Sequence, residues 1–346
     1  MRGITAPIDH ERGGIAVIVA LLMVVLLGFA AIAVDVAKLY SEQAQLQNGS
    51  DAVALAVARN CAVPAPSDVC ADISEDLRRL ANENAVDGQS TVQDPIDLNI
   101  GERRVTATTT AKENSSSPDT VSLFFARVLG LNSAEVSATS SVTWGSPTKG
   151  TAPFPLAFSV CQVSGMVGGG DQLLQSHDPS ANNKGTPGCT YAGQPVPGGF
   201  SWITQTPGIC GSSVDLLTSV SYSNTGNDAP SNCTSTVQDW QASILDGKDV
   251  VVLLPVFDRA SETGSSGTYH LTSFAAFKVR GWKLASGNGT NASLIFRNTR
   301  ADVGDLACTG DCRGIIGSFI KYVSLADGYT LGPVSPYGAT VVELTS

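Results

Sequence analysis

The chain has 346 residues, enough to bury one hydrophobic core and room for a second. It carries 31 acidic and 21 basic residues, for a formal charge of −10. This charge argues against nucleic-acid binding, whose affinity comes largely from lysine and arginine on phosphates. With 42% hydrophobic residues, the chain is also too apolar to be generally disordered.

The first predicted element is a membrane span. Gly14 to Val34 are 21 consecutive residues without a charge, and at about 1.5 Å per residue they cover roughly 30 Å, the thickness of the hydrocarbon core. A cleaved signal peptide has a shorter apolar region of about 7–15 residues, although Ala30, Ala31 and Ala33 leave a cleavage site as the alternative. We expect a permanent transmembrane helix at residues 14–34, after a cytoplasmic tail at residues 1–13.

The cysteines predict the side of the membrane on which the bulk of the protein lies. All eight follow residue 60, and an even number beyond a span is typical of disulfides in an oxidising compartment, with buried free thiols as the alternative. Arg2 and Arg12 precede the span, which favours a cytoplasmic amino terminus. From their spacing we expect two pairs, Cys61–Cys70 and Cys308–Cys312.

Residues 35–60 are predicted to continue the span as a helical stalk. Leu39, Leu46 and Val53 recur every seven residues, and Val36 and Val57 fall on the same stripe. Such a narrow apolar seam suits packing on another helix, including that of another copy, or equally on the protein's own domain. Asn48-Gly49-Ser50 is expected to be a soft spot at which the helix could kink or restart.

These residues also carry a family resemblance. The stretches "ERGGIAV", "AIAVDVAKLY" and "QLQNGSDAVALAVA" are similar to the amino-terminal domain of TadE/TadG-like proteins, which belong to the bacterial tight-adherence (Flp pilus) assembly system. Gly49 departs from the alanine that the family carries after "LQN". The resemblance implies a role beside other pilus-assembly proteins or pilin helices at the bacterial cell envelope.

Residues 61–145 are predicted to form a small α+β domain. The apolar spacing predicts a helix from Asp68 to Ala85, and alternation around Gly101-Glu102 predicts a β-hairpin. A helix capped by Asp119 and closed by Gly130 follows. The segment from Val136 to Trp144 is then expected to be a strand with alternate residues on one face.

The remaining chain is predicted to be a linker and a mainly β domain. Residues 146–156 are rich in Pro, Gly and Thr, as is typical of a linker. Residues 157–346 are expected to form a disulfide-containing β-rich domain with one short helix at Val237–Leu245. Its strands are expected in the stretches "DVVVLLPVFD", "TYHLTSFAAFKVRGWKL", "SLIFRNT", "RGIIGSFIKYVSL" and "ATVVELT". The fold class is therefore α+β, with an amino-terminal transmembrane helix.

Sequence motifs for catalysis are largely missing. His177 and His270 could each act as a general base, but a simple hydrogen-bonding role is favoured for both. The stretches "DPSAN" and "DGKD" do not match a metal motif, although a structural calcium ion at an acidic loop stays as an alternative. Asp35 is expected in the headgroup region, paired with Lys38, with a partner's lysine as the alternative. We expect no catalytic residue, no cofactor and no metal ligand.

Three functions therefore follow from the sequence, in order of preference. The first is a non-enzymatic, single-span component of tight-adherence pilus assembly or anchoring. The second is a surface-exposed binding module of the adhesin type. The third is a membrane-anchored hydrolase that uses His177 or His270.

Overall fold

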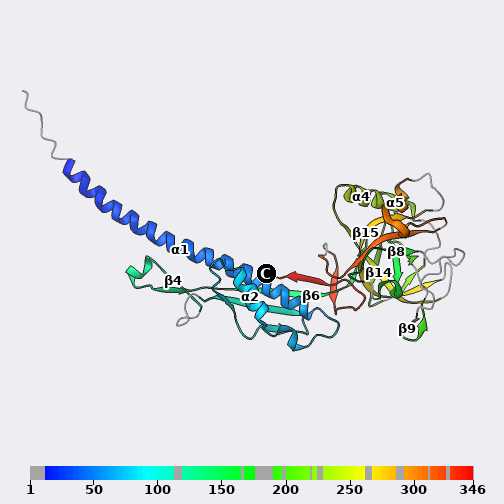
Figure 1. The fold of residues 1–346 in the computed structure, drawn as a ribbon, viewed down its shortest axis with the longest axis horizontal. Helices are drawn as coiled ribbons and strands as arrows, with labels where there is room; N and C mark the ends of the chain where they lie inside the picture. The colour runs from blue at the N-terminus through cyan, green and yellow to red at the C-terminus, as the bar shows by residue number, and fades with distance from the viewer. Residues whose placement is uncertain are drawn as a thin grey trace, which may run out of the picture.

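The computed structural model describes residues 12–112, 119–164, 167–175, 190–196, 200–218, 220–223, 229–261, 267–285, 292–310, 312–324 and 328–345. It contains a long amino-terminal helix, a sheet packed on the carboxy-terminal half of that helix, and a larger sheet at the far end of the molecule (Figure 1). The amino-terminal half of the helix projects away from both sheets (Figure 1). The predicted fold class is confirmed: an apolar amino-terminal helix, strand-rich domains, and disulfides in the carboxy-terminal region.

The helix α1 runs from Arg12 to Cys61 as one unit of 50 residues. It continues through Asn48-Gly49-Ser50, so the helical stalk predicted at residues 35–60 is confirmed and the possible restart at this soft spot does not occur. The reason is packing, because Gly49 is buried against the next helix. A Cβ atom built on Gly49 would lie 3.5 Å from the carbonyl oxygen of Ala81, an ordinary contact distance.

Two short helices follow, where the sequence predicted one helix from residue 68 to residue 85. They are the 3-10 helix η1 (Asp68–Ala71) and the helix α2 (Glu75–Glu83). Asp72 has an extended backbone, which ends η1. The side chain of Ser74 then accepts the N–H of Leu77 at 3.3 Å and caps a new helix.

The first sheet packs on α1. The predicted hairpin is confirmed, since Leu98 lies opposite Val105 in an antiparallel pair. The predicted strand face is also confirmed, because Val142 and Trp144 are buried and pack with Val53 of α1. The strands of this sheet are β1 (Ser90–Val92), β2 (Asp97–Asn99), β3 (Arg104–Ala111), β6 (Ser137–Ala152), β12 (Ser212–Asp215), β18 (Thr330–Gly332) and β19 (Val341–Leu344).

The predicted helix from Asp119 to Gly130 is wrong. This segment is a hairpin, in which β4 (Thr120–Ser122) pairs with β5 (Ser133–Glu135) across a 3-10 turn, η2 (Ala126–Leu129). Asp119 has a left-handed φ of 69°, and its N–H donates to the carbonyl oxygen of Ala111 at 2.9 Å. It therefore directly precedes a strand instead of capping a helix.

The predicted linker at residues 146–156 is also wrong over most of its length, because β6 continues to Ala152 and β7 begins at Leu156. The strand has partners throughout this stretch, since Lys149 lies opposite Asp215 of β12 and opposite Thr330 of β18. Pro147, which has no N–H to donate, lies at a register irregularity in the pairing with β18. One strand thus joins the two halves of the protein.

The second sheet forms the larger core. Its central pair is β14 (Val250–Ser261) and β15 (Thr268–Lys283), and a bulge in β14 lies between Val256 and Arg259, directly after Pro255. Aromatic rings fill the core, with the ring centroids of Phe277 and Phe319 4.9 Å apart. The other strands are β7 (Leu156–Ser159), β8 (Gln172–Gln175), β11 (Phe200–Trp202), β13 (Val220–Tyr222), β16 (Ile295–Phe296) and β17 (Gly314–Ile320).

Helix α4 (Thr234–Leu245) confirms the predicted short helix, and Gly247 follows it with a φ of 77°. Two predictions need correction. The stretch "SLIFRNT" holds only the two-residue strand β16, preceded by the 3-10 helix η5 (Ala292–Leu294). The last strand, β19, pairs with β6 in the first sheet instead of with the carboxy-terminal strands. The minor elements are α3 (Val160–Val163), β9 (Thr190–Tyr191), β10 (Gln194–Pro195), η3 (Ser231–Cys233), α5 (Arg300–Val303) and η6 (Gly304–Leu306).

Candidate functional site

The exposed half of α1 is the first part of the candidate site. Within the described residues, the structure has one helix long and apolar enough to cross a membrane, and none of its apolar window is buried inside the protein. Its side chains are exposed all round, for example 65% for Leu21 and 69% for Val24. An uncovered helix that is apolar on every side requires a lipid environment. This indicates a single-pass membrane protein.

Asp35, the first charged residue after the span, is only 3% exposed. Its carboxylate accepts three backbone N–H groups from the β4–β5 hairpin: Phe124 at 2.9 Å, Phe125 at 2.9 Å and Ala126 at 2.6 Å. Burial acts to raise the pKa of Asp35, but these three donors and the nearby Lys38 outweigh it and hold the pKa below its ordinary value. The main partners of Asp35 are therefore amides of its own chain, which sequence reasoning did not foresee.

Lys38 lies one turn further along α1 and also contacts the hairpin. Its ammonium group donates to the carbonyl oxygen of Ser122 at 3.1 Å and lies 5.1 Å from the ring centroid of Phe124. Asp35 and Lys38 therefore hold the hairpin against α1 at the point where the span ends.

The polar residues of "LQNGSDA" dock α1 on the first sheet. Gln47 donates to the hydroxyl of Ser140 at 2.8 Å, and the hydroxyls of Ser50 and Ser140 lie 2.8 Å apart. Ser140 also hydrogen-bonds to Asp51. One serine of β6 thus meets three polar side chains from consecutive turns of α1, which fixes the axial position of the helix on the sheet.

The predicted apolar seam divides into two parts. Leu46, Val53 and Val57 are buried against the protein's own first sheet and α2. Leu39 is partly buried at the edge of this contact, and Val36 is 43% exposed. The seam beyond residue 46 therefore packs within the chain, and its beginning faces outward.

The outward part of the seam lines an open groove of about 410 Å³ between α1 and β5. Tyr40 lies in this groove and is 74% exposed. The lining is more apolar than polar in character, with one carboxylate at its edge. Its residues are Val36, Leu39, Tyr40, Gln43, Glu135 and Val136.

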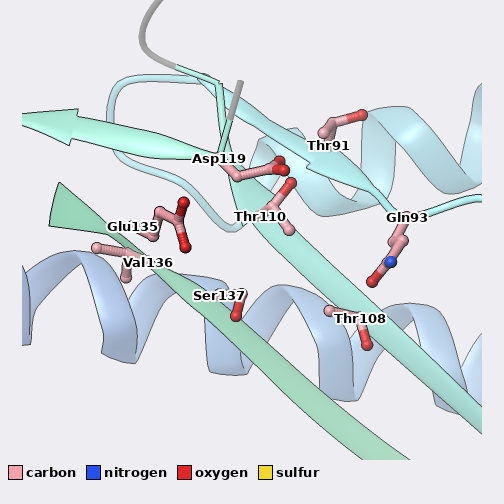
Figure 2. A pocket seen from close by; sticks show the side chains of 8 residues that line it. All are labelled: Thr91, Gln93, Thr108, Thr110, Asp119, Glu135, Val136 and Ser137. Atoms are coloured by element: carbon pink, nitrogen blue, oxygen red, sulfur yellow. The ribbon is translucent and has the colours of Figure 1, made fainter. Parts of the chain in front are cut away.

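A polar hollow of about 310 Å³ lies on the other side of the hairpin base (Figure 2). Figure 2 shows hydroxyl, amide and carboxylate side chains from β1, β3 and the hairpin around it. The carboxylates of Asp119 and Glu135 could accept hydrogen bonds from a polar ligand. Among the described residues, no group of three or more His, Cys, Asp or Glu side chains is placed to hold a metal ion. The lining residues are Thr91, Gln93, Thr108, Thr110, Asp119, Glu135, Val136 and Ser137.

The structure joins both cysteine pairs named from the sequence. The Cα atoms lie 5.1 Å apart in Cys61–Cys70 and 5.4 Å apart in Cys308–Cys312. The first bond ties the end of α1 to η1. A third disulfide, Cys210–Cys233, closes a loop across 23 residues. Sequence reasoning missed it because spacing alone does not identify distant pairs.

His270 lies 2.6 Å from Asp258, measured from Nδ1 to Oδ1, an arrangement that orients the imidazole. His270 also lines a separate open pocket of about 380 Å³, together with Ser261 and Thr268, whose hydroxyls hydrogen-bond to each other. In "DGKD", Asp246 and Asp249 pair with Lys248 and Lys278. His177 and "DPSAN" lie outside the described residues.

Comparison with known proteins identifies the amino-terminal part of the chain. The Tad family model, described as Flp pilus-assembly TadE/G-like, matches residues 13–60. The search of curated proteins and the search of solved structures each gave no match. The matched residues include the exposed span, Asp35, and the polar residues Gln47, Ser50 and Asp51 that hydrogen-bond to Ser140. The resemblance expected from the sequence is thus confirmed for residues 13–60 of α1, which are similar to the TadE/G-like Flp pilus-assembly family.

Proposed function

We propose that this chain is a non-enzymatic, membrane-anchored component that assembles or anchors the Flp (tight-adherence) pilus at the bacterial cell envelope. The observation that supports it most strongly is the overlap between the family match at residues 13–60 and α1. The matched segment includes both the exposed span and the residues that fix it to the first sheet. In this proposal the matched segment therefore fixes where the first sheet lies relative to the membrane.

The amino terminus lies in the cytoplasm in this proposal, and both sheets lie outside it. Arg2 and Arg12 precede the span, which favours retention of that end in the cytoplasm. Three disulfides among the described residues favour an oxidising compartment for the other end.

The groove beside Val36 and Tyr40 is where another helix packs in this proposal. It continues the surface of the span, and the side chains of Val36 and Tyr40 in it are 43% and 74% exposed. A neighbouring pilus-assembly protein or a pilin that shares the membrane would present an apolar helix at the same depth. Because a helix packs through side chains at every third or fourth position, Val36, Leu39 and Tyr40 suit such a contact.

The test is recovery of pilus components with the tagged full-length protein from native membranes. The wild-type protein should recover at least one of them, and Tyr40→Glu should abolish recovery because it places a charge in the groove. Ser41→Glu is the matched control, since it adds the same charge to an exposed position on a different face of α1. It should retain both recovery and pili.

Two outcomes would contradict this proposal. The first is that the wild-type protein recovers no pilus component. The second is that pili form normally when the gene is deleted.

A further inference from the structure

The tip of the β4–β5 hairpin, residues 123–131, carries an unusual set of exposed apolar side chains. Five of them are 47–86% exposed, although the tip is only nine residues long. Contiguous apolar surface of this kind marks an interaction site. The five residues are Phe124, Phe125, Val128, Leu129 and Leu131.

The tip is fixed at the depth where the membrane span ends. Asp35 follows directly on the apolar run that ends at Val34, and it accepts the N–H groups of Phe124, Phe125 and Ala126. Figure 1 shows the hairpin lying beside α1 and reaching towards its amino-terminal end. The exposed apolar side chains of the tip therefore lie next to the exposed apolar surface of the span.

The polar groups of the tip suit the boundary between lipid and water. Residues 123–131 include one charged side chain, that of Arg127, and no acidic one. Lys38 lies beside Phe124 on the same side of the molecule. Apolar and aromatic side chains next to lysine or arginine are the composition of segments that lie in the membrane interface.

We infer that this hairpin tip inserts into the bilayer leaflet at the Asp35 end of the span, as a second membrane contact beside it. The occupant of the apolar surface is then lipid, because the tip shares its depth with the end of the span. Two contacts held together by Asp35 would fix the tilt and rotation of α1, which a single helix does not. The inference rests on the membrane placement of residues 14–34 and is independent of the pilus role.

The test introduces one additional tryptophan at a time into the full-length protein. Each variant is reconstituted in phosphatidylcholine nanodiscs with and without brominated acyl chains. The four native tryptophans are at most 7% exposed, and the unsubstituted protein gives their signal for subtraction. Val128→Trp and Leu129→Trp should emit at shorter wavelength than an exposed tryptophan and lose emission in brominated lipid. Both positions are exposed, so neither substitution disturbs packing.

Two further positions make the result decisive. Val86→Trp is the aqueous control, since Val86 is 92% exposed and lies beside Gln45, ten residues beyond Asp35 along α1. Val24→Trp reports on the span itself. Quenching at residue 24 without quenching at residues 128 and 129 would overturn the inference, and would leave the tip to bind another protein. No quenching at residue 24 would overturn the membrane placement on which the inference depends.

Discussion

The carboxylate of Asp35 holds the β4–β5 hairpin through three backbone N–H groups. Replacing Asp35 by Asn removes the charge and turns one acceptor oxygen into an amide donor, so at least one of the N–H groups of Phe124, Phe125 and Ala126 loses its acceptor. Hydrogen bonds to charged groups are stronger than neutral ones. In Asp35→Asn we therefore expect the amides of residues 124–126 to exchange with deuterium at least about tenfold faster.

The same bond gives a pH dependence with a definite sign. The pKa of Asp35 lies below its ordinary value in the folded protein, so the carboxylate favours the docked hairpin fully above about pH 4. This contribution is lost as pH falls through the lowered pKa. Protection of the tip amides, corrected for intrinsic exchange, should therefore decrease only below about pH 4.

Two controls separate this effect from a general loss of stability. Asp305→Asn removes a carboxylate that is 99% exposed and should leave the tip amides unchanged. Asp35→Asn itself should show no acid step. Equal exchange rates in wild type and Asp35→Asn would show that the three hydrogen bonds do not hold the hairpin.

At the scale of elements, the helices and strands that could be predicted from the sequence are those whose residue pattern is local. The membrane span and the β2–β3 hairpin follow from an uncharged run and from alternation around Gly101-Glu102. The helix expected at residues 119–130 failed because Phe124, Phe125, Val128 and Leu129 have helical spacing without forming a buried face. Their pattern reflects an exposed tip held by Asp35, a contact across 91 residues that no local pattern contains.

Gly49 offers a prediction about helix packing. A Cβ atom there would meet Ala81 and Thr109 at 3.5–3.8 Å, which is ordinary contact. Gly49→Ala should therefore raise the free energy of unfolding of the first sheet by about 0.5–1 kcal/mol, because alanine favours helix over glycine. Gly49→Leu should lower it by about 1–3 kcal/mol through overpacking against α2.

Native-state hydrogen exchange of the β3 amides in detergent would measure both effects. The pair serves as its own control, since the two substitutions have opposite expected signs at one position. Destabilisation by alanine would show that α1 and α2 lie closer together than the structure has them.

At the scale of the molecule, the chain's last strand closes its first sheet. Val341 lies opposite Gly145 and Leu344 opposite Val142, so β19 covers an edge of β6. Nearby, Gly150 leaves room for the ring of Tyr329, whose hydroxyl donates to the carbonyl oxygen of Thr151 at 2.6 Å. The carboxy-terminal segment thus stabilises the sheet that holds the membrane helix. The sequence predicted two successive domains, but the end of the chain returns to the first sheet.

Deletion of residues 341–346 should therefore destabilise the part of the protein nearest the membrane. It removes Val341, which is 2% exposed, and its lost burial alone should lower the free energy of unfolding of the first sheet by about 1.5–3 kcal/mol. Uncovering the edge of β6 should also promote aggregation. Faster exchange of the amides at residues 142–145 and earlier elution in size-exclusion chromatography would report the two effects. Glu343→Lys is the control: it keeps the strand and changes only an exposed side chain, so this variant should behave as wild type. If the first sheet stays intact after the deletion, β19 is not needed to complete that sheet.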